Sequence, residues 1–124
     1  METDYIIGLD VGTSGTKALA FSCSGKLLNS RKTEYQAIQT AVDRMEHDAV
    51  TVSQKALHCL NELILTMGHA PLAVGIDTFM HSLMPVDDEI KPMGNLMLWN
   101  DFRSASYAAD LKDTSLGNRP SLSI

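Results

Sequence analysis

The sequence has few cysteines, no long apolar run and no surplus of basic residues. Only Cys23 and Cys59 occur among 124 residues, with no signal peptide before them, which favours reduced thiols in a cytoplasmic protein. The longest early apolar run, residues 5–11, is too short to cross a membrane. The formal net charge is −5 and Lys and Arg do not cluster. We therefore expect neither nucleic acid nor a membrane as a partner, and the sequence does not indicate an oligomeric state.

The most informative segment is the small-residue turn that follows the first apolar run. That run predicts a strand buried on both faces, with Asp10 near its carboxyl end and buried too. The two glycines of the turn can adopt positive φ values, which point successive N–H groups into one concavity suited to phosphate. The remaining side chains supply hydroxyls and a cation, so the candidate phosphate-binding residues are Asp10, Gly12, Thr13, Ser14, Gly15, Thr16 and Lys17. Asp10 would hold Mg²⁺ through water molecules, because Mg²⁺ dehydrates reluctantly. The alternative is a β-hairpin turn that binds nothing.

The residues after this turn predict strands rather than a helix. Neither the Walker pattern nor the three-glycine dinucleotide pattern is present. We expect antiparallel strands at about 4–11, 16–23 and 26–35, with Gly25 in the second turn. A phosphate hairpin between two strands, followed by a third, resembles the actin-like ATPase fold that sugar kinases, Hsp70-type chaperones and actin share.

The middle of the chain predicts a polar loop at 36–46 and then an amphipathic helix at about 48–67. Asp48 is the expected N-cap and Gly68 the expected end. Apolar residues recur at three- and four-residue steps, namely Val52, Ala56, Leu57, Leu60, Leu63, Ile64 and Met67. Cys59 lies on the same apolar side. Three histidines have no metal-ligand spacing and are expected in solvated or capping roles: His47, His58 and His69.

A strand at 72–77 follows this helix. Because the helix makes a crossover, the strand should lie parallel to the first one. Asp10 and Asp77 would then open onto the same sheet edge, where ligands bind in open α/β sheets. Residues 83–89 predict a short strand and an acidic turn.

Two later segments combine polar and apolar groups as a polyol site requires. Met80 and His81 place a thioether beside a hydrogen-bonding ring, and residues 99–103, Trp-Asn-Asp-Phe-Arg, bring together an aromatic face, an amide, a carboxylate and a guanidinium. Hydroxyls need donors and acceptors, while the carbon chain needs an apolar surface. The alternatives are a core aromatic at Trp99, a structural histidine at His81, and a helix N-cap at Asp101 before a last helix at about 101–112.

Together these segments resemble the amino-terminal part of the FGGY family of carbohydrate kinases. The resemblance runs from about Tyr5 to Leu116 and rests on three segments in the family's order: Asp10 to Lys17, Gly75 to Ser82, and Trp99 to Ser104. Residues 43–46 and 80–92 are most similar to gluconate kinases. Residues 98–101 are more similar to xylulose kinases.

This resemblance implies an α/β fold and a kinase activity. The fold would be an actin-like ATPase (ribonuclease H-like) domain, whose mixed sheet has three antiparallel strands and then a parallel one, flanked by helices. The activity would be ATP-dependent phosphorylation of a sugar or sugar acid, with ATP and Mg²⁺ as cofactors. Asp10 and the phosphate turn would meet Mg-ATP, and the substrate-binding residues would be Met80, His81, Trp99, Asp101 and Arg103. A gluconate carboxylate would need the bidentate fork of Arg103.

The chain departs from the family in its length. Kinases of this family are several times longer, and their catalytic base and adenosine-binding segments have no counterpart here. We therefore expect residues 1–117 to be a partial amino-terminal actin-like domain and residues 118–124 an unplaced tail, in a truncated chain that is inactive or weakly active alone. Neither Asp10 nor Asp101 is assigned as the base. The alternative function is a non-catalytic actin-like module that binds nucleotide or a sugar.

Overall fold

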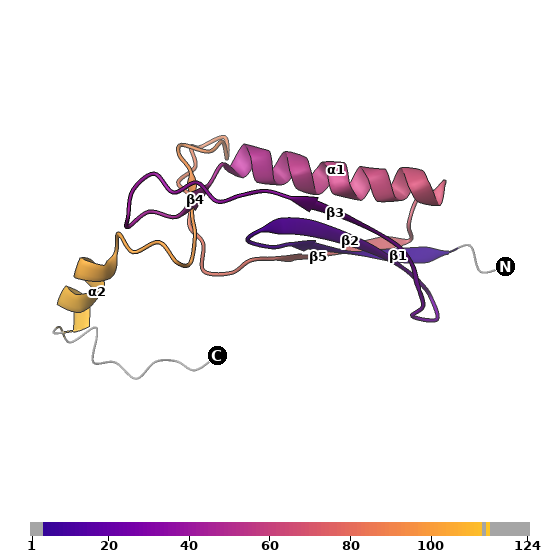
Figure 1. Cartoon of the computed structure of the whole chain (residues 1–124), viewed down its shortest axis with the longest axis horizontal. Coiled ribbons are helices and arrows are strands. Elements are labelled where there is room, and N and C mark those ends of the chain that lie inside the picture. Colours follow the sequence, from indigo (N-terminus) through magenta and orange to yellow (C-terminus); the bar gives the residue numbers. More distant parts are fainter. Residues whose placement is uncertain (1–3, 113, 115–124) are drawn as a thin grey trace.

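A four-stranded sheet forms the body of the protein in the computed structural model, which describes residues 4–112 and 114 (Figure 1). The strands run in the order β3 (Leu27–Glu34), β2 (Gly15–Ser22), β1 (Tyr5–Val11) and β5 (Ala73–Thr78). The pairs β1–β2 and β2–β3 are antiparallel, whereas β1 and β5 are parallel. The predicted mixed sheet is confirmed.

Helix α1 (Ala49–Met67) covers one face of this sheet, lying over β2 and β3. Its caps are as predicted: the Asp48 carboxylate accepts the Val50 N–H at 3.0 Å, and Gly68 adopts a φ of 80°. The helix buries the residues spaced by three and four positions, Val52, Ala56, Cys59 and Leu63, and leaves Leu57 exposed. Both cysteines are free thiols. Packing of this apolar stripe on the sheet makes the core.

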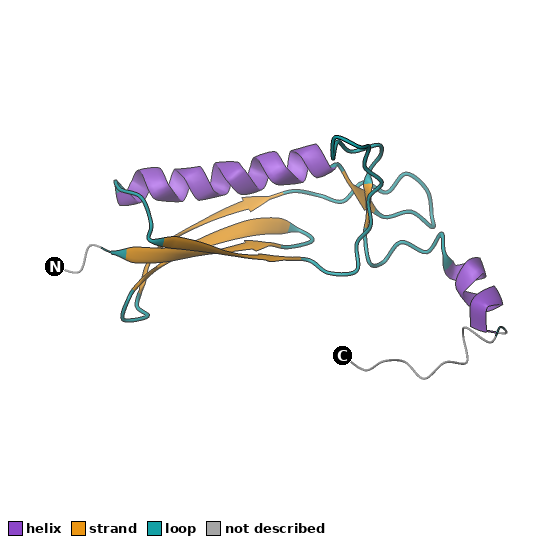
Figure 2. Ribbon diagram, turned by 180° about the vertical axis from the view of Figure 1, so that it is seen from behind, coloured by secondary structure: helices purple, strands orange, loops and turns teal. Residues whose placement is uncertain are grey.

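The other face of the sheet is not covered by any helix of the described residues (Figure 2). Strand β1 therefore alternates: Tyr5, Ile7, Leu9 and Val11 are buried under α1, while Ile6 and Asp10 are exposed. The expectation that β1 is buried on both faces, with Asp10 buried, is wrong for this reason. Every residue of β5 is exposed as well.

A small second sheet adjoins the end of the main one. It pairs β4 (Glu46–His47) with β6 (Leu96–Met97) in antiparallel fashion, and Ile38 forms a further bridge to Glu46. The predicted polar loop at 36–46 is thus partly wrong, since its end is strand. Residues 83–89 form isolated bridges at Leu83 and Val86 instead of the predicted strand. The acidic turn that follows is confirmed, because the Asp87 carboxylate accepts the Glu89 and Lys91 amides.

Helix α2 (Ala105–Lys112) stands apart from the sheet and buries none of its residues (Figures 1 and 2). It begins at Ala105, not near residue 101, so the N-cap interpretation of Asp101 is wrong. The Asp101 carboxylate instead accepts the Arg103 N–H at 3.1 Å in a turn that precedes the helix. The predicted tail at 118–124 lies outside the described residues. None of the helices in the described part is both long and apolar enough to cross a bilayer.

Candidate functional site

The predicted phosphate turn joins β1 to β2 as a tight hairpin, closed by the Gly12 N–H and the Gly15 carbonyl at 2.9 Å. Gly12 and Gly15 do not have the positive φ values expected of them; among the described glycines only Gly25 and Gly68 do. Gly15 is required for a different reason, because a Cβ there would lie 2.6 Å from the carbonyl oxygen of Thr33 on β3. Strand β3 can therefore pack close to the turn only beside a glycine.

Gly15→Ala should destabilise the protein by about 1–3 kcal/mol, because the added methyl would force the backbones of β2 and β3 apart. Urea unfolding of the variant measures this loss. Gly8→Ala is the matched control, since a Cβ at Gly8 has no heavy atom within 4 Å. Equal stability of the two variants would contradict the steric role of Gly15.

Two buried side chains hold the turn from the core side. The Tyr35 hydroxyl donates to the Gly12 carbonyl at 2.6 Å, and His47 Nε2 contacts the Thr13 carbonyl at 2.7 Å. The expectation of a solvated or capping His47 is wrong: it is only 2% exposed and packs edge-on against the Tyr35 ring at 5.3 Å. Thr16 also differs from expectation, because its hydroxyl is buried and donates to the Asp10 carbonyl at 2.8 Å.

The carboxyl end of β1 carries a row of charged side chains on the open face. Asp10 is in register with Lys17 on β2 and with Asp77 on β5, as predicted for the two acids, and all three are exposed. Directly paired residues project from the same face of a sheet. In the described residues no three His, Cys, Asp or Glu side chains converge into a metal site. The carboxylates of Asp10 and Asp77 fit a cation that keeps most of its water ligands, such as Mg²⁺.

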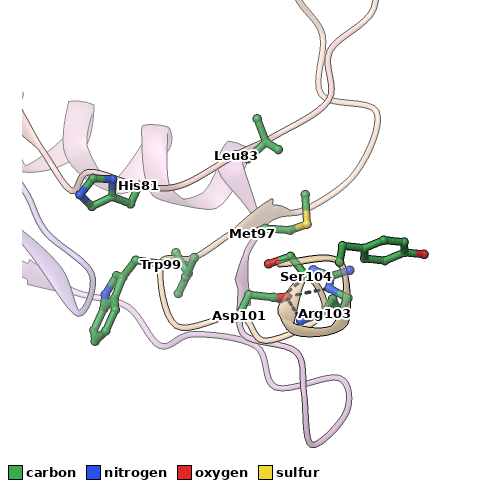
Figure 3. A pocket seen from close by; sticks show the side chains of 9 residues that line it. His81, Leu83, Met97, Trp99, Asp101, Arg103 and Ser104 are labelled. Carbon is green, nitrogen blue, oxygen red and sulfur yellow. Dashed lines mark hydrogen bonds and ion pairs between the residues drawn. The ribbon is translucent and has the colours of Figure 1, made fainter. Parts of the chain in front are cut away.

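The two sugar-type segments meet around a hollow of about 380 Å³ beside β6 (Figure 3). Its lining residues are His81, Leu83, Met97, Leu98, Trp99, Asp101, Arg103, Ser104 and Tyr107. Trp99 is 62% exposed, so the core-aromatic interpretation is wrong and its ring is free to face a ligand. His81 has a left-handed backbone, with a φ of 59°. Such strain in a non-glycine residue is concentrated at functional sites.

A second hollow of about 380 Å³ connects this region to the phosphate turn. Thr13, Asp77, Thr78, Phe79, Met80, His81 and Trp99 line it. Two buried polar atoms next to these residues in the sequence, Ser82 Oγ and Asn100 Oδ1, have no hydrogen-bond partner. Buried polar atoms are normally paired, so these two are suited to a ligand or water molecule.

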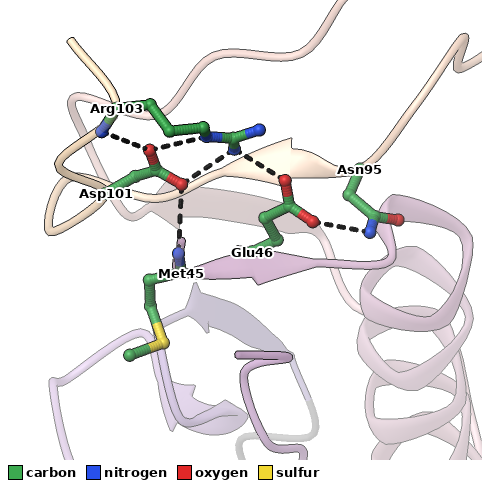
Figure 4. Close-up of polar contacts among 5 residues, drawn as sticks. All are labelled: Met45, Glu46, Asn95, Asp101 and Arg103. Carbon is green, nitrogen blue, oxygen red and sulfur yellow. Dashed lines mark hydrogen bonds and ion pairs between the residues drawn. The ribbon is translucent and has the colours of Figure 1, made fainter. Parts of the chain in front are cut away.

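Asp101 and Arg103 form the centre of a polar network (Figure 4). Arg103 donates through Nε at 2.9 Å and Nη2 at 2.8 Å to the two carboxylate oxygens of Asp101. The same Nη2 lies 2.6 Å from Glu46. Asp101 also accepts the Met45 N–H at 3.0 Å, and Asn95 donates to Glu46 at 2.9 Å. The network ties the last segment of the site to β4.

Comparison with known proteins assigns this arrangement to a family. Residues 5–122 match the model of the FGGY family of carbohydrate kinases, N-terminal domain. The chain belongs to this family. Members are phosphotransferases that act on carbohydrates and use ATP.

Relatives of this chain include kinases with different substrates in their names. It is 27% identical over 119 residues to gluconokinase of Bacillus subtilis and 32% identical over 120 residues to xylulose kinase of Lactococcus lactis. These matches cover 94% and 93% of the chain. The crystal structure of gluconate kinase from Lactobacillus acidophilus superposes with a TM-score of 0.86 at 28% identity, covering 91% of the chain and 23% of that protein. The chain likewise spans 23% of the length of both curated relatives.

Hydrogen bonds keep Asp101 and Glu46, the two acids of the network, ionised. The Arg103 guanidinium, with the Met45 N–H, holds the pKa of Asp101 well below its usual range. Hydrogen bonds from Asn95, and then from Arg103, lower the pKa of Glu46. A carboxylate whose pKa is lowered on folding stabilises the protein above its unfolded pKa, and that contribution is lost as the pH falls through the folded value.

Asp101→Asn should therefore be less stable than the natural chain at about pH 7, and the difference should shrink below about pH 4. Urea unfolding across this pH range measures both proteins. Asp88→Asn, in the exposed acidic turn, is the control and should show no such difference. A difference that stays constant with pH would contradict the ionised Asp101.

Sequence reasoning missed Glu46 and His47 as residues of this site. They are adjacent in β4, and each contacts a segment more than thirty positions away. A two-residue strand has no periodicity to detect, so only the similarity of residues 43–46 to gluconate kinases offered a signal. The other two histidines of the group expected in solvated or capping roles are both exposed, as expected: His58 on α1 and His69 just after it.

Proposed function

We propose that this chain forms the phosphate- and sugar-binding portion of an ATP-dependent kinase acting on a sugar or sugar acid of the gluconate or xylulose type. The observation that carries the proposal is the hollow lined both by Thr13 of the phosphate turn and by His81 and Trp99 of the sugar-type segments. Phosphoryl transfer requires the phosphate donor and the acceptor hydroxyl to lie side by side. One hollow that both segments line meets this requirement.

On the phosphate side, the turn residues Gly12, Thr13, Ser14 and Gly15 would surround the phosphate oxygens, with Lys17 as a nearby cation. Mg²⁺, held by Asp10 through water, would neutralise phosphate charge when bound. The proposal is supported by the exposed row of Lys17, Asp10 and Asp77 at the carboxyl end of β1.

On the sugar side, Trp99 and Met80 would supply apolar contact, and His81 would bond to a hydroxyl. The Nε and Nη2 edge of Arg103 already faces Asp101 and Glu46, so this edge is not open for the bidentate contact expected with a substrate carboxylate. A carboxylate would instead meet Nη1, which has no partner among the described residues. Asp101 would then orient Arg103 or accept a hydrogen bond from a substrate hydroxyl. The unpaired Ser82 Oγ and Asn100 Oδ1 add hydrogen-bonding capacity.

Neither Asp10 nor Asp101 is assigned as the catalytic base. Asp101 has a strongly lowered pKa because Arg103 donates to it, which makes it a weak proton acceptor. Asp10 is assigned to metal. The base of the reaction would therefore come from outside this chain, which supports the alternative that the chain by itself is a binding module without turnover.

Calorimetric titration of the chain tests the binding half of the proposal. We expect ATP and inorganic tripolyphosphate, each with Mg²⁺, to bind with similar affinity, and adenosine to bind much more weakly, because phosphate groups carry the recognition. Asp10→Ala and Thr13→Ala should each lower ATP affinity roughly fivefold to tenfold, while Asp88→Ala should not. Equal affinity for ATP and adenosine would contradict phosphate-led binding.

A chimera tests the catalytic half. Residues 5–117 would replace the matching amino-terminal region of the Bacillus subtilis gluconokinase, and ADP release would be followed with gluconate, xylulose and glycerol. We expect turnover with one of the first two substrates, abolished by Asp10→Ala. A folded chimera that is inactive on all three, together with ATP binding by the chain alone, would favour the non-catalytic module.

A further inference from the structure

The carbonyl groups of the phosphate turn are fixed by side chains from two other segments. Tyr35 follows β3, and its hydroxyl donates to the Gly12 carbonyl at 2.6 Å. His47 lies in β4, and its Nε2 contacts the Thr13 carbonyl at 2.7 Å. A carbonyl oxygen only accepts, so His47 must carry its hydrogen on Nε2. Two consecutive peptide groups are therefore held from the core side.

Holding these carbonyls also fixes the amides on the other side of the same peptide planes. The peptide bond is planar and trans, so its N–H points opposite to its C=O, and the described chain has no cis peptides. Since the Gly12 and Thr13 carbonyls point at buried Tyr35 and His47, the amides of Thr13 and Ser14 point away from the core. Neither amide has an acceptor among the described residues. Two successive outward N–H groups form a concavity that attracts anions.

The supporting side chains are themselves rigidly placed. Tyr35 and His47 are both buried, their rings meet edge to face at 5.3 Å, and Phe79 packs on His47 at 6.2 Å. Burial, and then the nearby charge of Asp10, raise the pKa of Tyr35, so its phenol stays protonated and able to donate. The backbone N–H of Tyr35 also donates to the Ser14 carbonyl at 3.2 Å. The turn thus rests on a packed aromatic support.

We propose that Tyr35 and His47 are positioning residues that aim the Thr13 and Ser14 amides at a phosphate group of the nucleotide. The inference rests on the proposed function, because it assumes that the turn binds phosphate. It assigns to His47 a role that its position before a helix does not indicate. Removing either hydrogen bond should let a peptide plane rotate and lower phosphate affinity without removing any group that contacts the phosphate.

The test is a titration of the isotope-labelled chain with inorganic tripolyphosphate, followed by the NMR signals of the backbone amides. In the natural chain, the Thr13 and Ser14 signals should shift most. Tyr35→Phe and His47→Leu should each weaken binding roughly fivefold, the cost of one hydrogen bond, and should reduce those two shifts. His47→Gln, which keeps an N–H donor, should retain most of the affinity.

Tyr5→Phe is the matched control, because Tyr5 is also buried and its hydroxyl also donates to a backbone carbonyl, that of His69 at the far end of the sheet. It should lose stability as Tyr35→Phe does, yet bind tripolyphosphate normally. Unchanged affinity and unchanged amide shifts in Tyr35→Phe and His47→Leu would overturn the positioning role. Binding that shifts other amides but not those of Thr13 and Ser14 would overturn it too, while leaving phosphate binding intact. No binding by the natural chain would overturn both proposals.

Discussion

Arg103→Leu should raise the equilibrium constant for unfolding roughly tenfold or more, because removing one partner of a mostly buried ion pair leaves uncompensated charge. Nη2 of Arg103 contacts both Asp101 and Glu46, at 2.8 and 2.6 Å, and these two carboxylates are largely shielded from solvent. Without the guanidinium they would face each other. Urea unfolding at about pH 7 measures the change.

A second substitution separates charge repulsion from lost packing. Glu46→Gln combined with Arg103→Leu removes one of the two facing carboxylates, so the double variant should be more stable than Arg103→Leu alone. Arg103→Lys should lie between the natural chain and Arg103→Leu, since lysine keeps the charge but not the planar fork. A double variant no more stable than Arg103→Leu would show that packing, not charge, dominates at this position.

Leu63→Ala should cost about 3 kcal/mol of folding free energy, within the range for deleting a fully buried leucine side chain. Leu63 is 0% exposed on the face of α1 that packs against the sheet. Leu65→Ala on the same helix is the control, because Leu65 is 75% exposed and should change stability by less than about 0.5 kcal/mol. Thermal and urea unfolding of both variants check the prediction, and similar losses would contradict the observed orientation of α1.

The main sheet and α1 could be predicted because their signals are local. Capping by Asp48 and Gly68 depends on residues within a few positions of the helix ends, and the apolar steps along α1 follow one helical face. The crossover then made β5 parallel to β1, which brought Asp10 and Asp77 into register. The exposure of Asp10 could not be predicted in this way, because periodicity does not say whether anything covers the second face of a sheet.

The supports of the site were less predictable because their partners are distant. His47 contacts a carbonyl 34 positions away, and Met45 donates to Asp101 across 56 positions. Gly15 illustrates a different difficulty. A turn glycine is usually explained by a positive φ, yet here it makes room for the backbone of Thr33. The local sequence of the turn does not show that a neighbouring strand comes this close.

The two residues of β4 have an order that matters as much as their identity. Successive strand residues project to opposite sides, so Glu46 turns toward the guanidinium of Arg103 while His47 turns toward the carbonyl of Thr13. Each side thus pairs a donor with an acceptor. Transposing the pair to His-Glu would conserve composition, charge and volume, yet it would set a carboxylate against a carbonyl oxygen, two acceptors with no hydrogen between them, and would give the guanidinium a neutral ring in place of a carboxylate. The order Glu-His therefore matters, because the reversed order would replace one hydrogen bond by a repulsion and one ion pair by a contact with a neutral ring.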